Sequence, residues 1–175
     1  MTHHETPASE TASRPAVAGG ALRRAVILGG NRIPFARANT AYAEVGNQEM
    51  LTATLDGLVA RFGLQGERLG QVTAGAVLKH PRNFNLTREA VLGSALSAAT
   101  PAADVQVACA TGMEALGTLA NKIRLGQLDS AIGGGVDSIS DAPVSLSDGA
   151  RRVLLQLNTA KTMNCLLYTS DAADE

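Results

Sequence analysis

The chain has 175 residues, the usual size of one domain and enough to bury a sizeable core. Its formal net charge is −1 and only 18% of its residues are charged, so it lacks the basic excess that holds a nucleic acid. No apolar run reaches the roughly 20 residues of a membrane-spanning helix, and two cysteines cannot form a disulfide framework, which favours a reduced, cytoplasmic setting.

Residues 1–22 are rich in Ser, Thr, Pro, Ala and Glu and lack the basic and apolar regions of a signal peptide. We therefore expect a disordered tail, with order beginning near Arg23. His3 and His4 are only a pair, fewer than the ligands of a usual metal site, so no metal is expected.

Short apolar runs and helical spacings then alternate along the chain. The runs predict strands at residues 25–28, 71–78, 104–108 and 130–135. The spacings predict helices at residues 48–62, 86–96, 110–125 and, more briefly, 153–157. Gly63 and Gly126 are expected to end helices, and the helix at 110–125 is expected to bury a stripe of Met113, Leu116, Ala120 and Ile123. The alternation predicts an α/β fold with a mainly parallel sheet and helices on both faces.

Cys109 is expected where the third strand turns into the following helix. A helix N-terminus presents unpaired N–H groups and a partial positive charge, which favour a thiolate and can stabilise an oxyanion on a thioester carbonyl. Gly112, Ala115 and Gly117 keep the first turns slim, so a substrate or another backbone can approach. A single cysteine in such a position is also typical of a small buried hydrophobic residue. The residues alone leave both roles open.

Four segments, in consistent order and spacing, resemble motifs of one enzyme family. They are residues 32–35 (RIPF), 85–88 (NLTR), 107–116 (VACATGMEAL), and 126–129 (GQLD) with 133–140 (GGGVDSIS). The third resembles the nucleophile segment of thiolases, and the others are similar to that family's R-T-P-F, N-x-x-R, and G-x-x-D with A-G-G-x-E-x-M-S motifs. There are departures from the pattern: Gln106 replaces a common Asn or Thr, Val107 a frequent Arg, and Asp137 a Glu.

The resemblance implies a thiolase amino-terminal α/β domain at residues 23–143 and the start of the family's loop domain at 144–164. Residues 165–175 (CLLYTSDAADE) resemble the read-through translation of a sequencing-library adapter, and we expect them to be an artefact. Residues 35–37, 109–111 and 155–162 are similar to the fatty-acid β-oxidation branch.

For thiolases, the resemblance implies thiolysis of a 3-ketoacyl-CoA to acetyl-CoA and a shortened acyl-CoA, or the reverse condensation, through an acyl group on Cys109. Coenzyme A is then a substrate and no cofactor is expected. The activating His and the second Cys come from the carboxy-terminal half in this family, so the piece present here is expected to be inactive. The implied assembly is a homo-oligomer, alone or with a β-oxidation α-subunit.

Two other functions stay open: a condensing enzyme similar to ketoacyl synthases, and a non-catalytic lipid-binding thiolase relative in which Cys109 is only core. His80 is expected in a surface loop, and Cys165 belongs to the suspect end of the chain. The glycines at 133–135 indicate close packing at a strand end rather than a phosphate cradle. Arg32 and Arg37 either guide the anionic CoA or form solvated surface, the latter being favoured.

Overall fold

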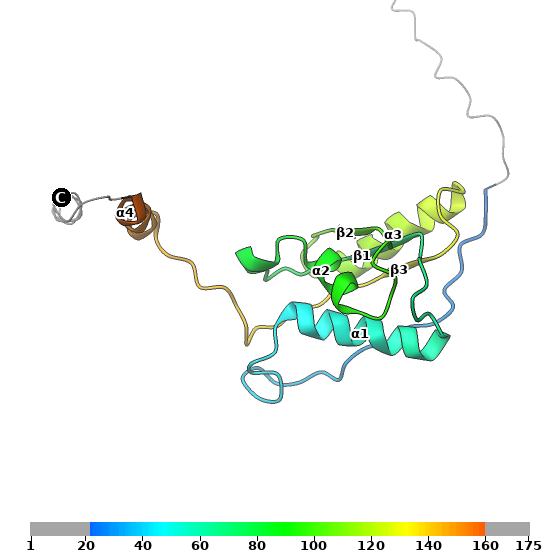
Figure 1. Ribbon diagram of the computed structural model, residues 1–175, viewed down its shortest axis with the longest axis horizontal. Coiled ribbons are helices and arrows are strands. Elements are labelled where there is room, and N and C mark those ends of the chain that lie inside the picture. Colours follow the sequence, from blue (N-terminus) through cyan, green and yellow to red (C-terminus); the bar gives the residue numbers. More distant parts are fainter. Residues whose placement is uncertain (1–21, 160–175) are drawn as a thin grey trace, which may run out of the picture.

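The sheet is made of three short parallel strands whose spatial order differs from their order in the chain. The computed structural model describes residues 22–159, and within them β1 (Gln71–Ala74), β2 (Ala102–Asp104) and β3 (Ala131–Gly133) pair in the order β2-β1-β3 (Figure 1). Val72 lies opposite Ala102 on one side and Ile132 on the other. Parallel neighbours need a crossover connection, and a helix supplies each one.

Helices cover both faces of this sheet, as the sequence predicts. α2 (Leu86–Gly93) follows β1 and packs on β1 and β2, with α1 (Asn47–Phe62) packed against α2. α3 (Thr111–Arg124) follows β2 and packs on β1 and β3, and Figure 1 shows it across the sheet from α1. A short 3-10 turn, η1 (Pro81–Asn83), precedes α2, and α4 (Asp148–Thr159) stands away from the sheet.

The two faces of β1 alternate, as the pleat of a strand requires. Val72 and Ala74 are buried in the cluster that α1 and α2 form. The alternate side chains, Gln71 and Thr73, turn to α3. There Lys122 Nζ donates to Gln71 Oε1 at 2.7 Å, and Gln71 Nε2 donates to Thr73 Oγ1 at 2.9 Å. One face of the strand is therefore apolar core, and the other carries a polar chain of contacts.

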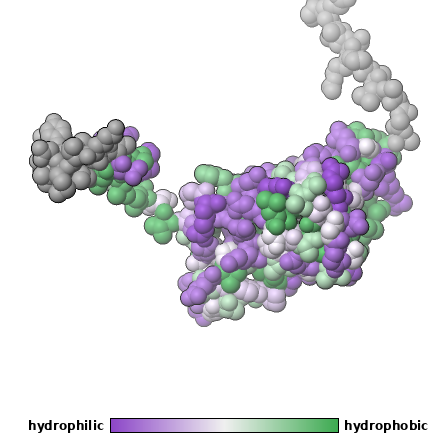
Figure 2. All heavy atoms as spheres, in the orientation of Figure 1, coloured by the Kyte–Doolittle hydropathy of each residue, from purple (hydrophilic) through white to green (hydrophobic). Residues whose placement is uncertain are grey.

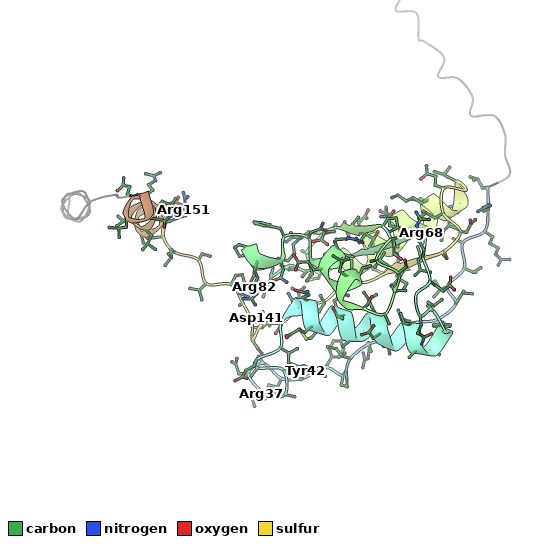
Figure 3. All side chains as sticks on the ribbon, viewed as in Figure 1. Arg37, Tyr42, Arg68, Arg82, Asp141 and Arg151 are labelled. Atoms are coloured by element: carbon green, nitrogen blue, oxygen red, sulfur yellow. The ribbon has the colours of Figure 1, made fainter. Side chains whose placement is uncertain are left out.

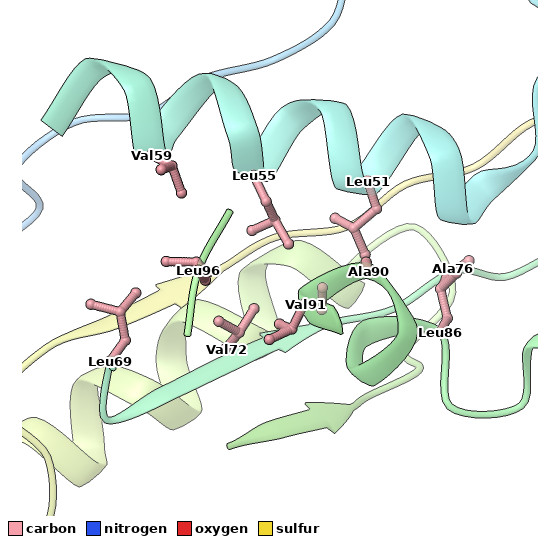
Figure 4. Packing of buried hydrophobic residues seen from close by; sticks show 11 residues of the cluster. Leu51, Leu55, Val59, Leu69, Val72, Ala76, Leu86, Ala90, Val91 and Leu96 are labelled. Atoms are coloured by element: carbon pink, nitrogen blue, oxygen red, sulfur yellow. The ribbon is translucent and has the colours of Figure 1, made fainter. Parts of the chain in front are cut away.

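The main core lies between α1, α2 and β1 (Figure 4). Leu51, Leu55 and Val59 recur every four residues and so form one stripe of α1. They meet the buried α2 residues Leu86, Ala90 and Val91. The predicted stop is confirmed, because α1 ends at Gly63 with φ +64°, a left-handed conformation that glycine adopts without strain.

The strand expected at residues 25–28 is not formed, and that prediction is wrong. The segment is extended, yet it has no ladder partner among residues 22–159 and the Ile27 side chain is 81% exposed. It is followed by isolated contacts: Arg61 donates to the Gly30 carbonyl at 2.8 Å and Asn31 to the Thr54 carbonyl at 3.1 Å. A strand needs a neighbouring edge to satisfy its backbone, and an apolar run alone does not provide one.

Two further expectations need correction. The third strand lies at Ala102–Asp104 rather than 104–108, because its ladder with β1 already runs from Pro101 to Val105 and the chain then turns away. On α3 the expected stripe is not the buried one: Met113 is 75% exposed and Ala120 and Ile123 are only partly buried, whereas Ala115 and Leu119 are buried. β3 comes close to this face of α3 and has a glycine there, because a Cβ on Gly133 would lie 3.0 Å from Leu116 Cδ2 and 3.2 Å from Leu119 Cδ1.

The other predicted elements are confirmed with shorter or shifted ends. β1 ends at Ala74, α2 ends at Gly93, and α4 is longer than the helix expected at 153–157. Gly126 follows α3 with φ +72°, as predicted. In the described part of the chain no helix is long and apolar enough to cross a membrane. The tail expected at residues 1–22, apart from its last residue, and the segment 165–175 lie outside the described residues.

Candidate active site around Cys109

Cys109 lies in the turn that carries the chain from β2 into α3, and its side chain is exposed. The turn is tight: Ala110 N–H donates to the Val107 carbonyl at 2.9 Å, and Thr111 N–H to the Ala108 carbonyl at 3.2 Å. Ala108, directly before the cysteine, has φ +44°, a left-handed conformation that costs a non-glycine residue about 1 kcal/mol or more. The fold thus maintains a strained turn that presents the Cys109 side chain to solvent, where the sequence alone left open a buried role.

Thr111 holds this turn together. Its hydroxyl accepts a hydrogen bond from Val107 N–H at 3.0 Å and donates one to the Ala108 carbonyl at 2.8 Å. Thr111 is itself buried, so the two bonds clamp both residues that precede Cys109. Thr111 was not predicted as a site residue, although a threonine two positions after a candidate nucleophile at a helix start is a recognisable signal.

α3 begins at Thr111, two residues after Cys109, so the helix N-terminus lies beside the Cys109 turn. The first N–H groups of a helix have no intrahelical acceptor and carry partial positive charge. Gly112 lies beside the chain that follows β3, because a Cβ added there would lie 3.8 Å from the Gly134 carbonyl carbon. The lack of a side chain at Gly112 therefore allows a close backbone contact, whereas Gly117 faces open space. A thiolate at Cys109 and an oxyanion beside it would both benefit from this field.

The loops that follow all three strands meet near the Cys109 turn. Val105 N–H donates to the Ala74 carbonyl and Val136 N–H to the Gly75 carbonyl, both at 3.0 Å. Gly75 admits no side chain, since a Cβ would lie 1.9 Å from the Val105 carbonyl oxygen. This is the carboxyl edge of a parallel sheet, where α/β proteins place their ligands.

The N-x-x-R segment anchors α2 rather than contributing a reactive group. Asp104, at the end of β2, accepts hydrogen bonds from Leu86 N–H at 3.1 Å and Thr87 N–H at 2.8 Å, and pairs with Lys79 Nζ at 3.0 Å. Arg88, the last residue of the segment, donates to the Ala98 carbonyl at 2.8 Å and to the Thr100 carbonyl at 2.9 Å. No pattern in the sequence singles out Asp104 or Lys79 for this role.

His80 lies in a separate cleft of about 400 Å³, whose lining does not include Cys109. Its Nε2 is 2.9 Å from the Asp141 carbonyl oxygen and 3.0 Å from Asp141 Oδ1. Arg82 Nη2 lies 3.0 Å from Asp141 Oδ2. Figure 3 labels these two residues next to each other. The His80 side chain is thus half-buried and engaged in the loop that holds Asp141, more tightly than its expected surface position implied.

The remaining sequence candidates lie on the surface. Arg32 stacks over the exposed Phe35 ring at 4.6 Å, and Arg37 is exposed. Gly133 packs against α3, as expected for a strand end. Within residues 22–159, no cluster of three His, Cys, Asp or Glu side chains could hold a metal ion. The hydrogen bonds described for residues 105–111 involve no histidine and no second cysteine.

Comparison with known proteins agrees with this geometry. Residues 25–175 match the family model described as the thiolase N-terminal domain. The chain is 34% identical over 160 residues to the mitochondrial trifunctional enzyme subunit beta of Mus musculus, covering 91% of this chain and 34% of that protein. It is 37% identical over 141 residues to a 3-ketoacyl-CoA thiolase of Photorhabdus laumondii subsp. laumondii, covering 81% and 32%.

A solved structure shares the fold. The crystal structure of the Bacillus anthracis acetyl-CoA acetyltransferase superposes with a TM-score of 0.69 at 26% sequence identity, over 73% of this chain and 32% of that one. The chain therefore spans about a third of the length of these relatives. The matched model covers the sheet, the helices and the Cys109 turn, and on this basis the chain belongs to the thiolase family.

Proposed function

We propose that Cys109 is the acyl-accepting nucleophile of a thiolase that cleaves 3-ketoacyl-CoA thioesters. The observation that carries the proposal is the exposed Cys109 thiol at the start of α3, in a turn that Thr111 clamps. The family membership supports it, and so does the likeness of residues 107–116 to the thiolase nucleophile segment.

The proposed reaction has two steps. The Cys109 thiolate attacks the keto carbonyl, and the oxyanion collapses with cleavage of the bond between C2 and C3. Acetyl-CoA leaves as its enolate, which takes up a proton, and the shortened acyl group stays on the Cys109 sulfur. The thiolate of a second CoA then attacks this thioester and regenerates the Cys109 thiolate. The partial positive charge at the N-terminus of α3 would stabilise negative charge on the carbonyl oxygen.

The substrate and assembly are part of the same proposal. The relatives named trifunctional enzyme subunit beta and 3-ketoacyl-CoA thiolase support the fatty-acid β-oxidation branch. We propose acyl-CoA and CoA as the small-molecule partners, with no cofactor beyond CoA as a substrate. The proposed assembly is a homo-oligomer, alone or bound to a β-oxidation α-subunit. The cytoplasmic location stays a prediction, since one relative is a mitochondrial protein by name.

The residues described supply a nucleophile and no base beside it, so we propose that the 175-residue chain alone does not turn over. Losing one member of a nucleophile–base pair typically costs several orders of magnitude in rate.

The test uses the full-length protein encoded by the intact gene. Thiolysis of acetoacetyl-CoA and of a long-chain 3-ketoacyl-CoA is compared between the wild type and Cys109→Ser, and we expect kcat to fall about 10⁴-fold or more. Mass spectrometry of the wild type, quenched without free CoA, should locate an acyl group on Cys109. Undiminished cleavage by Cys109→Ser would refute the proposal. Turnover only with carrier-protein thioesters would indicate a condensing enzyme instead.

A further inference from the structure

We propose that Asp137 and Gln106 are coupled positioning residues. They hold the backbone N–H and C=O of Val77 and, through them, the Cys109 turn. The proposal rests on the proposed role of Cys109 as a nucleophile, and it names what fixes that nucleophile in place. Neither side chain needs to touch a substrate for this role.

Asp137 fixes the loop that follows β1. Its Oδ1 accepts hydrogen bonds from Val77 N–H and from Leu78 N–H, both at 2.9 Å, and its Oδ2 lies 3.2 Å from Val77 N. One carboxylate therefore holds two consecutive backbone N–H groups from a position 60 residues away in the chain. Hydrogen bonds to an ionised acceptor are stronger than neutral ones, which makes this contact a specific anchor.

Gln106 binds the carbonyl group of the same residue, Val77. Its Nε2 donates to the Val77 carbonyl oxygen at 3.2 Å. The N–H of Val77 is thus bound from the β3 loop, and its C=O is bound from the segment that leads into Cys109. Movement at Asp137 is transmitted through Val77 to Gln106. Gln106 lies three residues before Cys109 in the chain.

The Cys109 turn needs such support because its conformation is strained at Ala108. Thr111 holds the turn from the α3 side. Gln106 and the ladder bond from Val105 to Ala74 hold it from the β2 side. If the β2 side loosens, Ala108 can relax, and the thiol then loses its alignment with the α3 N-terminus.

The two side chains also depart from the thiolase pattern in opposite directions of length. Asp137 is one methylene shorter than the Glu of the motif, and Gln106 is one methylene longer than the Asn that is common at its position. Both departures bear on Val77, one on each side of it. The longer Gln106 side chain therefore matches the shorter Asp137 side chain, and the effect of changing the length of one should depend on the length of the other.

The test measures the reactivity of Cys109 in the 175-residue chain carrying Cys165→Ser, so that only one thiol reacts. The rate of alkylation by iodoacetamide is measured across pH, relative to free cysteine, at low protein concentration. Asp137→Ala and Gln106→Ala are compared with Asp148→Ala, which removes an exposed carboxylate on α4. We expect each of the first two to slow alkylation about fivefold, with Asp148→Ala unchanged.

The length exchange separates positioning from simple loss of stability. Asp137→Glu and Gln106→Asn should each slow alkylation, and the double variant should be closer to the wild type than either single variant. The proposal is overturned if the four single variants leave the alkylation rate unchanged while only the thermal midpoint falls. It is equally overturned if the effects of the exchanges multiply as independent changes do. Iodoacetamide needs no acyl-CoA, so this result is independent of whether Cys109→Ser abolishes thiolysis.

Discussion

Replacing Asp104 with alanine should destabilise the domain more than any other change to a charged side chain described here. The Asp104 carboxylate binds the first two N–H groups of α2 and the Lys79 ammonium. It acts as an N-cap that β2 supplies to a helix from another part of the chain. Its side chain is only 15% exposed and that of Lys79 19%, so solvent replaces these interactions poorly once they are removed.

The magnitude follows from two contributions. Loss of a helix N-cap costs about 0.5–2 kcal/mol. Leaving the Lys79 charge without its partner costs up to about 3–5 kcal/mol for a fully buried group and about 1 kcal/mol or less for an exposed one. Since both side chains are largely but not fully buried, we expect Asp104→Ala to lower the free energy of unfolding by about 2–4 kcal/mol. Asp104→Asn keeps one acceptor and should lose about half of that.

Urea denaturation followed by circular dichroism measures this loss as a lower midpoint at an unchanged m-value. The matched control is Asp129→Ala, because Asp129 pairs with Arg23 at a position where its side chain is 87% exposed. That variant should stay within about 0.5 kcal/mol of the wild type. If Asp104→Ala and Asp129→Ala lower the midpoint equally, the cap and the half-buried ion pair do not carry the stability assigned to them.

Three other outcomes follow from the packing. Leu55→Ala, at a side chain only 1% exposed, should cost about 2–5 kcal/mol in the same urea experiment, whereas Leu154→Ala on α4 should cost little; equal costs would contradict the assigned core. Gly75→Ala should prevent a native urea transition because its Cβ would overlap the Val105 carbonyl, while Gly117→Ala, in a helix and facing open space, should stabilise by about 0.5–1 kcal/mol. Exposed apolar side chains, among them Val144 and Leu146, lie in the segment that leads to α4 (Figure 2), and they should drive self-association that light scattering detects. A monodisperse monomer at high concentration would argue against this expectation.

The elements that could be predicted from sequence are those specified by local patterns. Leu51, Leu55 and Val59 follow one helical stripe, and Gly63 ends it in a left-handed conformation, so α1 follows from periodicity and a stop signal. The strand-to-helix passage at Cys109 is likewise local, because a short apolar run gives way to small residues at helical spacing.

The groups that organise the site could not be predicted, because their partners are distant in sequence. Asp137 binds residues 59 and 60 positions away, and Asp104 reaches positions 17 to 25 away. A single sequence shows that an acid follows a strand, but the register of the sheet decides which N–H groups it meets. The same holds for Thr111, whose burial depends on how closely α3 approaches β1 and β3.

The two clearest errors share one physical cause. The expected strand at 25–28 and the expected stripe of Met113 and Leu116 are both apolar patterns whose side chains are exposed here. Apolar periodicity predicts burial, but it does not say against which surface. On α3 the sheet takes the side that carries Ala115 and Leu119, with Leu116 against Gly133 of β3, and this leaves Met113 facing outward.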